Sequence, residues 1–143
     1  MTYIPDALRR QVIERAQGRC EDCLLDQRDS LYAHEVDHII PEKHRGQTNA
    51  ENLCLSCLDC NRHKGSDFAS FDPDTDNVVL LFHPRRDIWE DHFRLKGAMI
   101  EPLTPIGRVT VFILHLNNEL RIRQRTVLQT AKRYPRKTRG DTN

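Results

Sequence analysis

The sequence predicts an α+β fold, and three observations support this fold class. Residues 5–17 carry apolar side chains at helical spacing, which predicts an amphipathic helix near the start of the chain. Residues 31–40 and 52–55 are short stretches of strand-forming residues separated by a polar loop. Two C-x-x-C pairs flank these stretches and suggest a metal-binding knuckle on each side. We therefore expect a small mixed domain built around two short strands.

The length of 143 residues fits one domain of ordinary size. We divide this domain, residues 1–143, into a core at about 18–67, an extension at 68–133 and a basic tail at 134–143. The start of the chain lacks an apolar core run, so we expect no signal peptide. No stretch reaches the ~20 apolar residues that would span a bilayer. These features predict a cytoplasmic protein without a membrane partner.

Residues that end strands and helices divide the first half of the chain into secondary-structure elements. The expected elements are a helix at 5–17, strands within 31–40 and at 52–55, and a helix at 58–64. Pro41 ends the first strand, because proline cannot continue a hydrogen-bonded ladder. Gly65 is the first residue that would stop the second helix, which begins at the second cysteine pair.

The second half is expected to hold short strands followed by two helices. The expected elements are a strand at 78–82, short strands within 94–103, a helix from Thr104 and a last helix over 119–133; turns or loops are expected at 71–77 and 83–93. Thr104 and Pro105 are a good helix start, with threonine as the cap and proline at the first position. In the last helix, we expect Leu120, Val127, Leu128 and Ala131 to face the body and Arg121, Arg123 and Arg125 to face solvent.

Charge is distributed unevenly along the chain. From Arg121 onward, eight Lys and Arg residues stand against Asp141 alone, which gives +7; because the whole chain carries +1, residues 1–120 carry −6. The basic end could therefore meet a polyanion such as DNA. A disordered, solubilising tail would have the same composition.

The cysteines are arranged for a metal ion. Cys20/Cys23 and Cys57/Cys60 form the two C-x-x-C pairs, and a Zn²⁺ ion takes four such thiolates at tetrahedral corners. A redox dithiol is the competing use of one C-x-x-C, but two copies flanking one insert favour zinc. For the fifth cysteine, Cys54, we expect a small buried residue of the second strand.

The 33 residues between Cys23 and Cys57 carry a second set of chemical groups. Hydrolysis of a phosphodiester needs a base for the attacking water and a cation to stabilise the developing charge. A carboxylate such as Asp37 binds such a cation and an imidazole such as His38 is such a base, and Asn61 directly follows the last cysteine, in the expected helix. Oxygen donors of this kind suit Mg²⁺.

The joint pattern of D-H-I-I-P, a later Asn-Leu and C-x-x-C-N-x-x-K-G resembles the HNH endonuclease family, with its ββα-metal fold, over about residues 20–67. The resemblance implies that the chain is a DNA endonuclease with structural zinc and a catalytic Mg²⁺ or other divalent cation. It implies that His38 is the general base, that Asp37 and Asn61 hold the catalytic metal, and that Asn52 braces the site loop. Lys64 would lie near the substrate phosphate. The residues expected to contact nucleic acid are Lys64, Arg62, Arg85 and Arg86.

The second half also resembles small stand-alone bacterial HNH proteins, in segments such as FHPRRDIWEDHF and LTPIGRVTV. His83 and His92 in this half are either extra ligands or structural histidines, and Arg85 and Arg86 are either phosphate contacts or a solvated turn. An alternative for the whole chain is a non-catalytic, zinc-stabilised module that binds nucleic acid or protein on the same fold. The joint presence of Asp37, His38 and Asn61 favours the enzyme.

Overall fold

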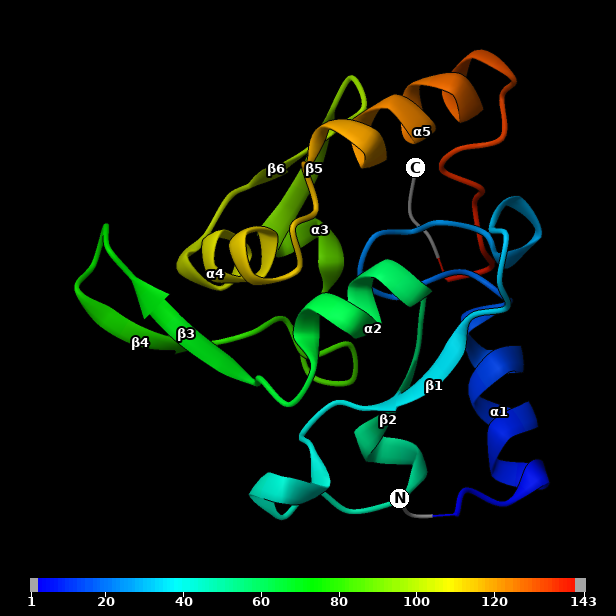
Figure 1. The fold of residues 1–143 in the computed structure, drawn as a ribbon, viewed down its shortest axis with the longest axis vertical. Coiled ribbons are helices and arrows are strands. Elements are labelled where there is room, and N and C mark those ends of the chain that lie inside the picture. Colours follow the sequence, from blue (N-terminus) through cyan, green and yellow to red (C-terminus); the bar gives the residue numbers. More distant parts are fainter. Residues whose placement is uncertain (1–2, 141–143) are drawn as a thin grey trace.

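The computed structural model of the chain describes residues 3–140 and confirms the α+β class (Figure 1). Its elements are α1 (Asp6–Ala16), β1 (Glu35–His38), β2 (Leu53–Ser56), α2 (Leu58–Lys64), β3 (Ala69–Asp72), β4 (Asn77–Leu80), α3 (Trp89–His92), β5 (Phe93–Lys96), β6 (Met99–Pro102), α4 (Pro105–Ile113) and α5 (Glu119–Thr130). None of the helices in this described part is both long and apolar enough to cross a membrane.

Strands β1 and β2 form an antiparallel pair that lies between α1 and α2 (Figure 1). Leu53 and Leu55 of β2 point toward α1 and join its Val12 in one apolar cluster. Because side chains alternate along a strand, Cys54 points to the opposite face, and its register partner Asp37 points there too. The face of β1 that carries Asp37 is therefore the face covered by α2.

A second apolar cluster joins the cysteines to the extension. It contains all four cysteines of the C-x-x-C pairs together with Phe82, Phe93, Ile100, Leu114 and Leu116. Phe93 and Ile100 come from the hairpin β5–β6, and Leu114 and Leu116 follow the end of α4. Helix α4 begins as expected, with the Thr104 hydroxyl accepting a hydrogen bond from the Gly107 N–H. The extension thus packs directly on the cysteine centre.

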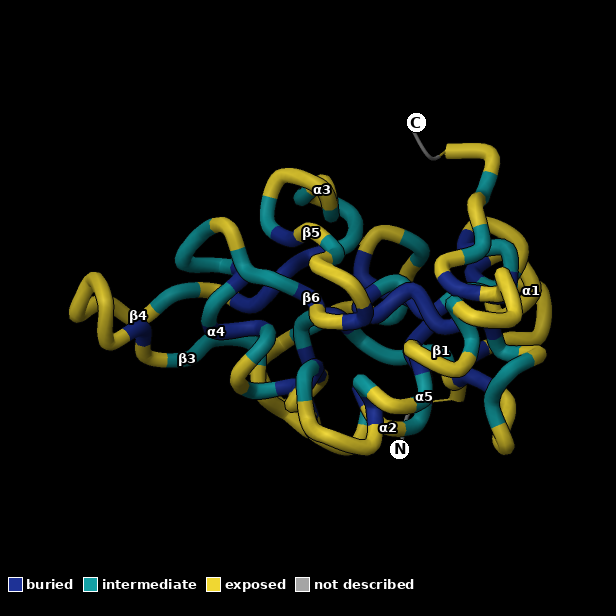
Figure 2. The backbone as a smooth tube through the Cα atoms, turned by 90° about the horizontal axis from the view of Figure 1, so that it is seen from above, coloured by how far each residue is buried: buried dark blue, intermediate teal, exposed yellow. Residues whose placement is uncertain are grey.

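The strand expected at 78–82 differs from the observed one. Strand β4 covers Asn77–Leu80 and pairs with β3, a strand that the sequence pattern did not reveal. Leu81 and Phe82 lie beyond the end of β4 and are buried in the body. Figure 2 shows the β3–β4 hairpin projecting from the body with an exposed tip. The last two apolar residues of the run at 78–82 are therefore core residues that follow the strand and are not part of it. The expected loop at 83–93 also contains the short helix α3.

The expected orientation of the last helix is wrong for most of the named residues, although Arg123 is exposed as expected. Arg121 and Arg125 of α5 are buried at 4% and 3% exposure, whereas Leu120 and Val127 are 73% and 63% exposed. Of the four apolar side chains expected to face the body, Leu128 alone packs there. The two arginines point inward because carbonyl and sulfur acceptors from other segments meet them.

The basic segment after α5 packs against the first cysteine pair. Tyr134 is buried, and its hydroxyl donates to the Cys23 carbonyl at 2.7 Å. Arg133 pairs with Asp29 at 2.6 Å, and Arg136 pairs with Asp26. Residues 134–136 are therefore a structural strap rather than a solvated tail, while Asp141–Asn143 lie outside the described residues.

Candidate active site and metal centre

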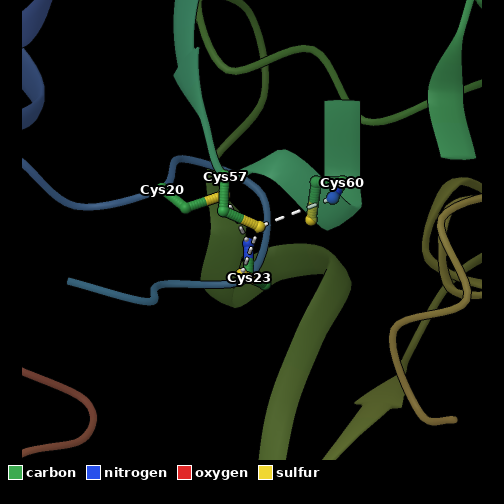
Figure 3. A group of neighbouring side chains, drawn as sticks. All are labelled: Cys20, Cys23, Cys57 and Cys60. Atoms are coloured by element: carbon green, nitrogen blue, oxygen red, sulfur yellow. Dashed lines mark hydrogen bonds between the residues drawn. The ribbon is translucent and has the colours of Figure 1, made fainter. Parts of the chain in front are cut away.

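The four cysteines of the two C-x-x-C pairs form a closed, buried sulfur cluster. Their side chains converge from two segments (Figure 3), and all four Sγ atoms lie within 4.8 Å of one another. Backbone N–H groups face two of the sulfurs: the Cys23 N–H points to Cys20 Sγ at 3.5 Å and the Cys60 N–H to Cys57 Sγ at 3.4 Å. Four converging thiols held in this way fit a tetrahedral Zn²⁺ ion. Within the described residues, this is the one group of three or more His, Cys, Asp or Glu side chains close enough to share a metal.

Helix α2 connects this metal centre to the residues of the insert. Cys57 caps the helix and Cys60 lies in its first turn, so the sulfur cluster fixes the position of α2. Asn61 and Lys64 follow on one face of α2, and both contact β1: the Asn61 amide donates to the Glu35 carboxylate, and the Lys64 ammonium donates to Asp37. Metal binding at the cysteines would therefore position the groups opposite β1.

Asp37 lies in a buried ion pair. The Lys64 Nζ atom is 2.9 Å from Asp37 Oδ2 and 2.8 Å from the His38 carbonyl oxygen. Burial raises the pKa of Asp37, and the Lys64 charge opposes this effect. Lys64 itself is only 7% exposed. Its contact with a substrate phosphate thus stays a prediction, because in this structure its donors hold the end of β1.

His38 ends β1 and enters the loop that follows. Its Nε2 atom lies 2.8 Å from the Thr48 hydroxyl and 3.8 Å from a Glu42 carboxylate oxygen. The side chain is 14% exposed, so it is ordered by the loop and still reaches solvent. His38 pairs in register with Leu53, on the sheet face opposite Asp37. The two adjacent residues therefore reach one site only at the edge where the strand ends.

Asn52 closes the loop between the strands. Its amide oxygen accepts from the Ile40 N–H at 2.9 Å, and its Nδ2 donates to the carbonyls of Ile40 at 2.9 Å and Gln47 at 2.8 Å. Gly46 passes so close that an added Cβ would lie 1.6 Å from the Ile40 carbonyl oxygen. Thr48, which contacts His38, belongs to the same loop. The loop therefore fixes the surroundings of the imidazole.

The arginines predicted to contact nucleic acid differ in exposure and in their contacts. Arg62 and Arg86 are exposed. Arg85 forms an ion pair with Glu21, whose other carboxylate oxygen accepts from the Leu55 N–H at 2.8 Å. Burial lowers the pKa of Arg85 to about 10. Arg85 thus ties the extension to the first knuckle, while a phosphate contact by Arg62 or Arg86 stays a prediction.

The two histidines of the extension lie within the packed structure. His83 is buried at 7% exposure and its Nδ1 accepts from the Arg85 N–H at 3.2 Å. His83 also lines a cavity of about 80 Å³ between the core and the extension. His92 Nδ1 lies 2.6 Å from the hydroxyl of Thr104. These contacts give both histidines structural roles.

Glu35 is the candidate residue that sequence reasoning missed. It lies two residues before Asp37 on β1, so both carboxylates share the face toward α2. Its carboxylate accepts from the amide of Asn61, the residue expected to bind metal. The alternation of side chains along the strand was the signal that could have found it.

Comparison with known proteins gives one family. Residues 20–67 match the family model described as HNH endonuclease. No curated protein and no solved structure matches the chain. The matched residues include both cysteine pairs, β1, β2, the connecting loop and α2, and the family implies a nuclease-type function. Residues 20–67 of this chain therefore match an HNH endonuclease domain, with four cysteines clustered for zinc.

Proposed function

We propose that the chain is a metal-dependent DNA endonuclease that hydrolyses phosphodiester bonds. One observation carries the proposal: Glu35 and Asp37 lie on one face of β1, where Asn61 contacts Glu35 and Lys64 contacts Asp37, while His38 stands at the end of the same strand. A base and a set of oxygen donors are therefore supported by one rigid ββα unit. Phosphodiester hydrolysis needs both kinds of group close together.

The donor set fits a divalent cation in its chemistry. Carboxylate and amide oxygens are the ligands that Mg²⁺ prefers, and Asp37 and Asn61 would supply them, with Glu35 as a further carboxylate on the same face. Such a cation would stabilise the charge that develops on the phosphoryl and leaving oxygens. The zinc at the cysteines would be structural, because all four of its ligands come from the protein.

The residues of the chain have separate tasks in this proposal. Neutral His38 takes the proton from the attacking water. Thr48 orients the imidazole through its 2.8 Å contact with Nε2. Lys64 holds Asp37 in place and fastens the His38 backbone through its bond to the carbonyl oxygen. Exposed Arg62, on the outer face of α2, is placed to contact the phosphate backbone.

The alternative is a non-catalytic nucleic-acid-binding module on the same fold, and one observation favours it. The Lys64 ammonium already neutralises Asp37, at 2.9 Å. A carboxylate paired with an ammonium in this way has less need of a metal cation. The alternative predicts DNA binding without cleavage.

Cleavage of supercoiled plasmid, in Mg²⁺, Mn²⁺ or Ni²⁺, separates the two functions. We expect His38→Ala to lower the rate by roughly 10² to 10⁴, the usual contribution of a positioned general base, with DNA binding retained. Asp37→Ala should recover part of its activity at higher metal concentration, whereas His38→Ala should not. The control is His63→Ala, which replaces an exposed histidine of α2 and should cleave like the parent. Parent rates in zinc-loaded His38→Ala and Asp37→Ala would refute the nuclease proposal.

A further inference from the structure

We propose that Arg121 is a positioning residue of the zinc centre, through which the metal and the carboxyl-terminal half of the chain hold each other in place. Arg121 lies in the first turn of α5, 54 positions beyond the last residue of the HNH match. Its guanidinium nevertheless contacts two of the four clustered sulfurs. The metal centre is thus completed by a part of the chain outside the matched domain.

The contacts of Arg121 link three segments at one buried point. Its Nη2 atom lies 3.0 Å from Cys60 Sγ and 3.7 Å from Cys57 Sγ, so it meets both sulfurs of the second pair. Its Nη1 atom donates to the carbonyl of Leu114, at the end of α4, at 2.8 Å. The residue is 4% exposed. One guanidinium therefore joins α2, α4 and α5.

The charge of a loaded centre explains why an arginine is buried there. Four thiolates with one Zn²⁺ carry a formal charge of about −2, and a buried charge is stable only when it is paired and hydrogen-bonded. Arg121 supplies a positive charge and N–H donors to the sulfurs. Release of the metal would remove the ion that holds Cys57 and Cys60 beside the guanidinium, so these contacts would no longer be fixed. Leaving a buried charge without fixed partners is unfavourable, so metal release should loosen α5.

Other residues strengthen the same link without touching sulfur. The Trp89 indole N–H donates to the Asp22 carbonyl at 2.9 Å, and the Tyr134 hydroxyl donates to the Cys23 carbonyl at 2.7 Å. Both contacts join residues outside 20–67 to the first cysteine pair. The loops that present the zinc ligands are therefore supported on two sides by residues outside 20–67.

Arg125 offers a matched comparison within the same helix. It is buried to the same extent, at 3% exposure, and its Nε and Nη2 atoms donate to the carbonyls of Ala98 and Leu116, both at 2.7 Å. No sulfur is among its hydrogen-bond partners in the described structure. Arg125→Met therefore disturbs the docking of α5 alone, whereas Arg121→Met also removes the donors to the thiolates.

The first test uses the unmodified protein. Amide hydrogen exchange is measured with zinc bound and after removal of zinc by a chelator. We expect α5 to lose protection together with α2 when zinc is removed, because the metal no longer holds in place the sulfurs that contact the guanidinium. Protection of α5 that survives zinc removal would overturn the proposal, as would purified protein that holds less than about half an equivalent of zinc for its single site. Neither readout depends on DNA cleavage.

The second test compares Arg121→Met, Arg121→Lys and Arg125→Met. Zinc release to a chromogenic chelator should be about 10- to 100-fold faster in Arg121→Met than in Arg125→Met, which is the usual effect of removing a partner of a metal ligand. Arg121→Lys should fall between them, because it keeps the charge but loses the planar fork of donors. In cobalt-loaded protein, the sulfur-to-metal charge-transfer band should shift for Arg121→Met only. Equal release and equal spectra in the two methionine variants would show that Arg121 only packs α5. If Arg121→Met does not fold, Arg121→Lys replaces it in the comparison: faster zinc release than in Arg125→Met supports the proposal, and equal release overturns it.

Discussion

Replacement of Asn52 by alanine tests whether the loop between β1 and β2 is held by one side chain. Asn52 is 9% exposed and makes three hydrogen bonds across the loop, to Ile40 N, Ile40 O and Gln47 O. Alanine removes all three and leaves these backbone groups without their partner. We expect the loop to open and the surroundings of His38 to lose their order.

The size of the effect follows from these three bonds. Each hydrogen bond contributes a net ~1 kcal/mol, so the full loss would be about 3 kcal/mol. Ile40 is partly exposed and Gln47 is exposed, so water replaces part of the lost bonding. We therefore expect the free energy of unfolding to fall by about 2 kcal/mol. If the whole ~2 kcal/mol is lost from the closed state of the loop, the cleavage rate falls by up to about 30-fold, since 1.36 kcal/mol corresponds to a factor of ten.

Urea unfolding of zinc-saturated protein measures the first quantity. The single tryptophan, Trp89, bonds to the first knuckle and reports unfolding by fluorescence. The control is Asn49→Ala, which replaces an exposed asparagine of the same loop and should change the free energy by less than about 0.5 kcal/mol. A loss below about 0.5 kcal/mol in Asn52→Ala would refute the bracing role of the amide.

Three further changes have outcomes set by the structure. Gly46→Ala should destabilise the same loop, as measured by urea unfolding, because its Cβ would lie 1.6 Å from a backbone carbonyl oxygen; parent stability would show that the loop shifts freely. Cys57→Ser removes one of the four clustered sulfurs and should lose zinc, which destabilises the insert because metal binding is folding energy. Cys54→Ser, outside the cluster, should keep one equivalent of zinc in elemental analysis. Hydrogen bonds from Arg108 lower the pKa of Asp72 to about 2 from the ordinary 3.8. A lowered folded-state pKa stabilises above the unfolded value and loses that effect as pH falls. The melting temperatures of parent and Asp72→Asn should therefore converge between about pH 4 and pH 2, and a constant difference would contradict this ion pair.

Local signals were sufficient for the ββα unit. Helix α2 lies at Leu58–Lys64, as predicted. The residues that set its limits, a cysteine at its start and Gly65 at its end, are its direct neighbours in the sequence. Helix α4 follows in the same way from Thr104 and Pro105. The clustering of the two C-x-x-C pairs also follows from sequence, because tetrahedral metal binding needs four donors in one place.

The long-range contacts of cationic residues could not be predicted. Arg121 and Arg125 have the polarity of a solvent face, and their burial depends on sulfurs and carbonyls that other segments deliver. Lys64 is similar: its place under β1 depends on Asp37, 27 positions earlier. Helical periodicity ranks residues by polarity alone and contains no information about acceptors brought by tertiary packing. The basic strap at 134–136 was unpredictable for the same reason.

Because side chains alternate along β1, the candidate site is held by two different parts of the structure, helix α2 and the loop between β1 and β2. Asp37 faces α2, where Lys64 holds it and Asn61 joins the adjacent Glu35; His38 faces the other side and depends on the loop that contains Thr48. Under the proposed function, α2 governs metal affinity and the loop governs proton transfer. Asn61→Ala should then raise the metal concentration needed for half-maximal cleavage, while Asn52→Ala lowers the rate at saturating metal. Exchanged defects would contradict this assignment, and both defects in each variant would mean that one support serves both groups.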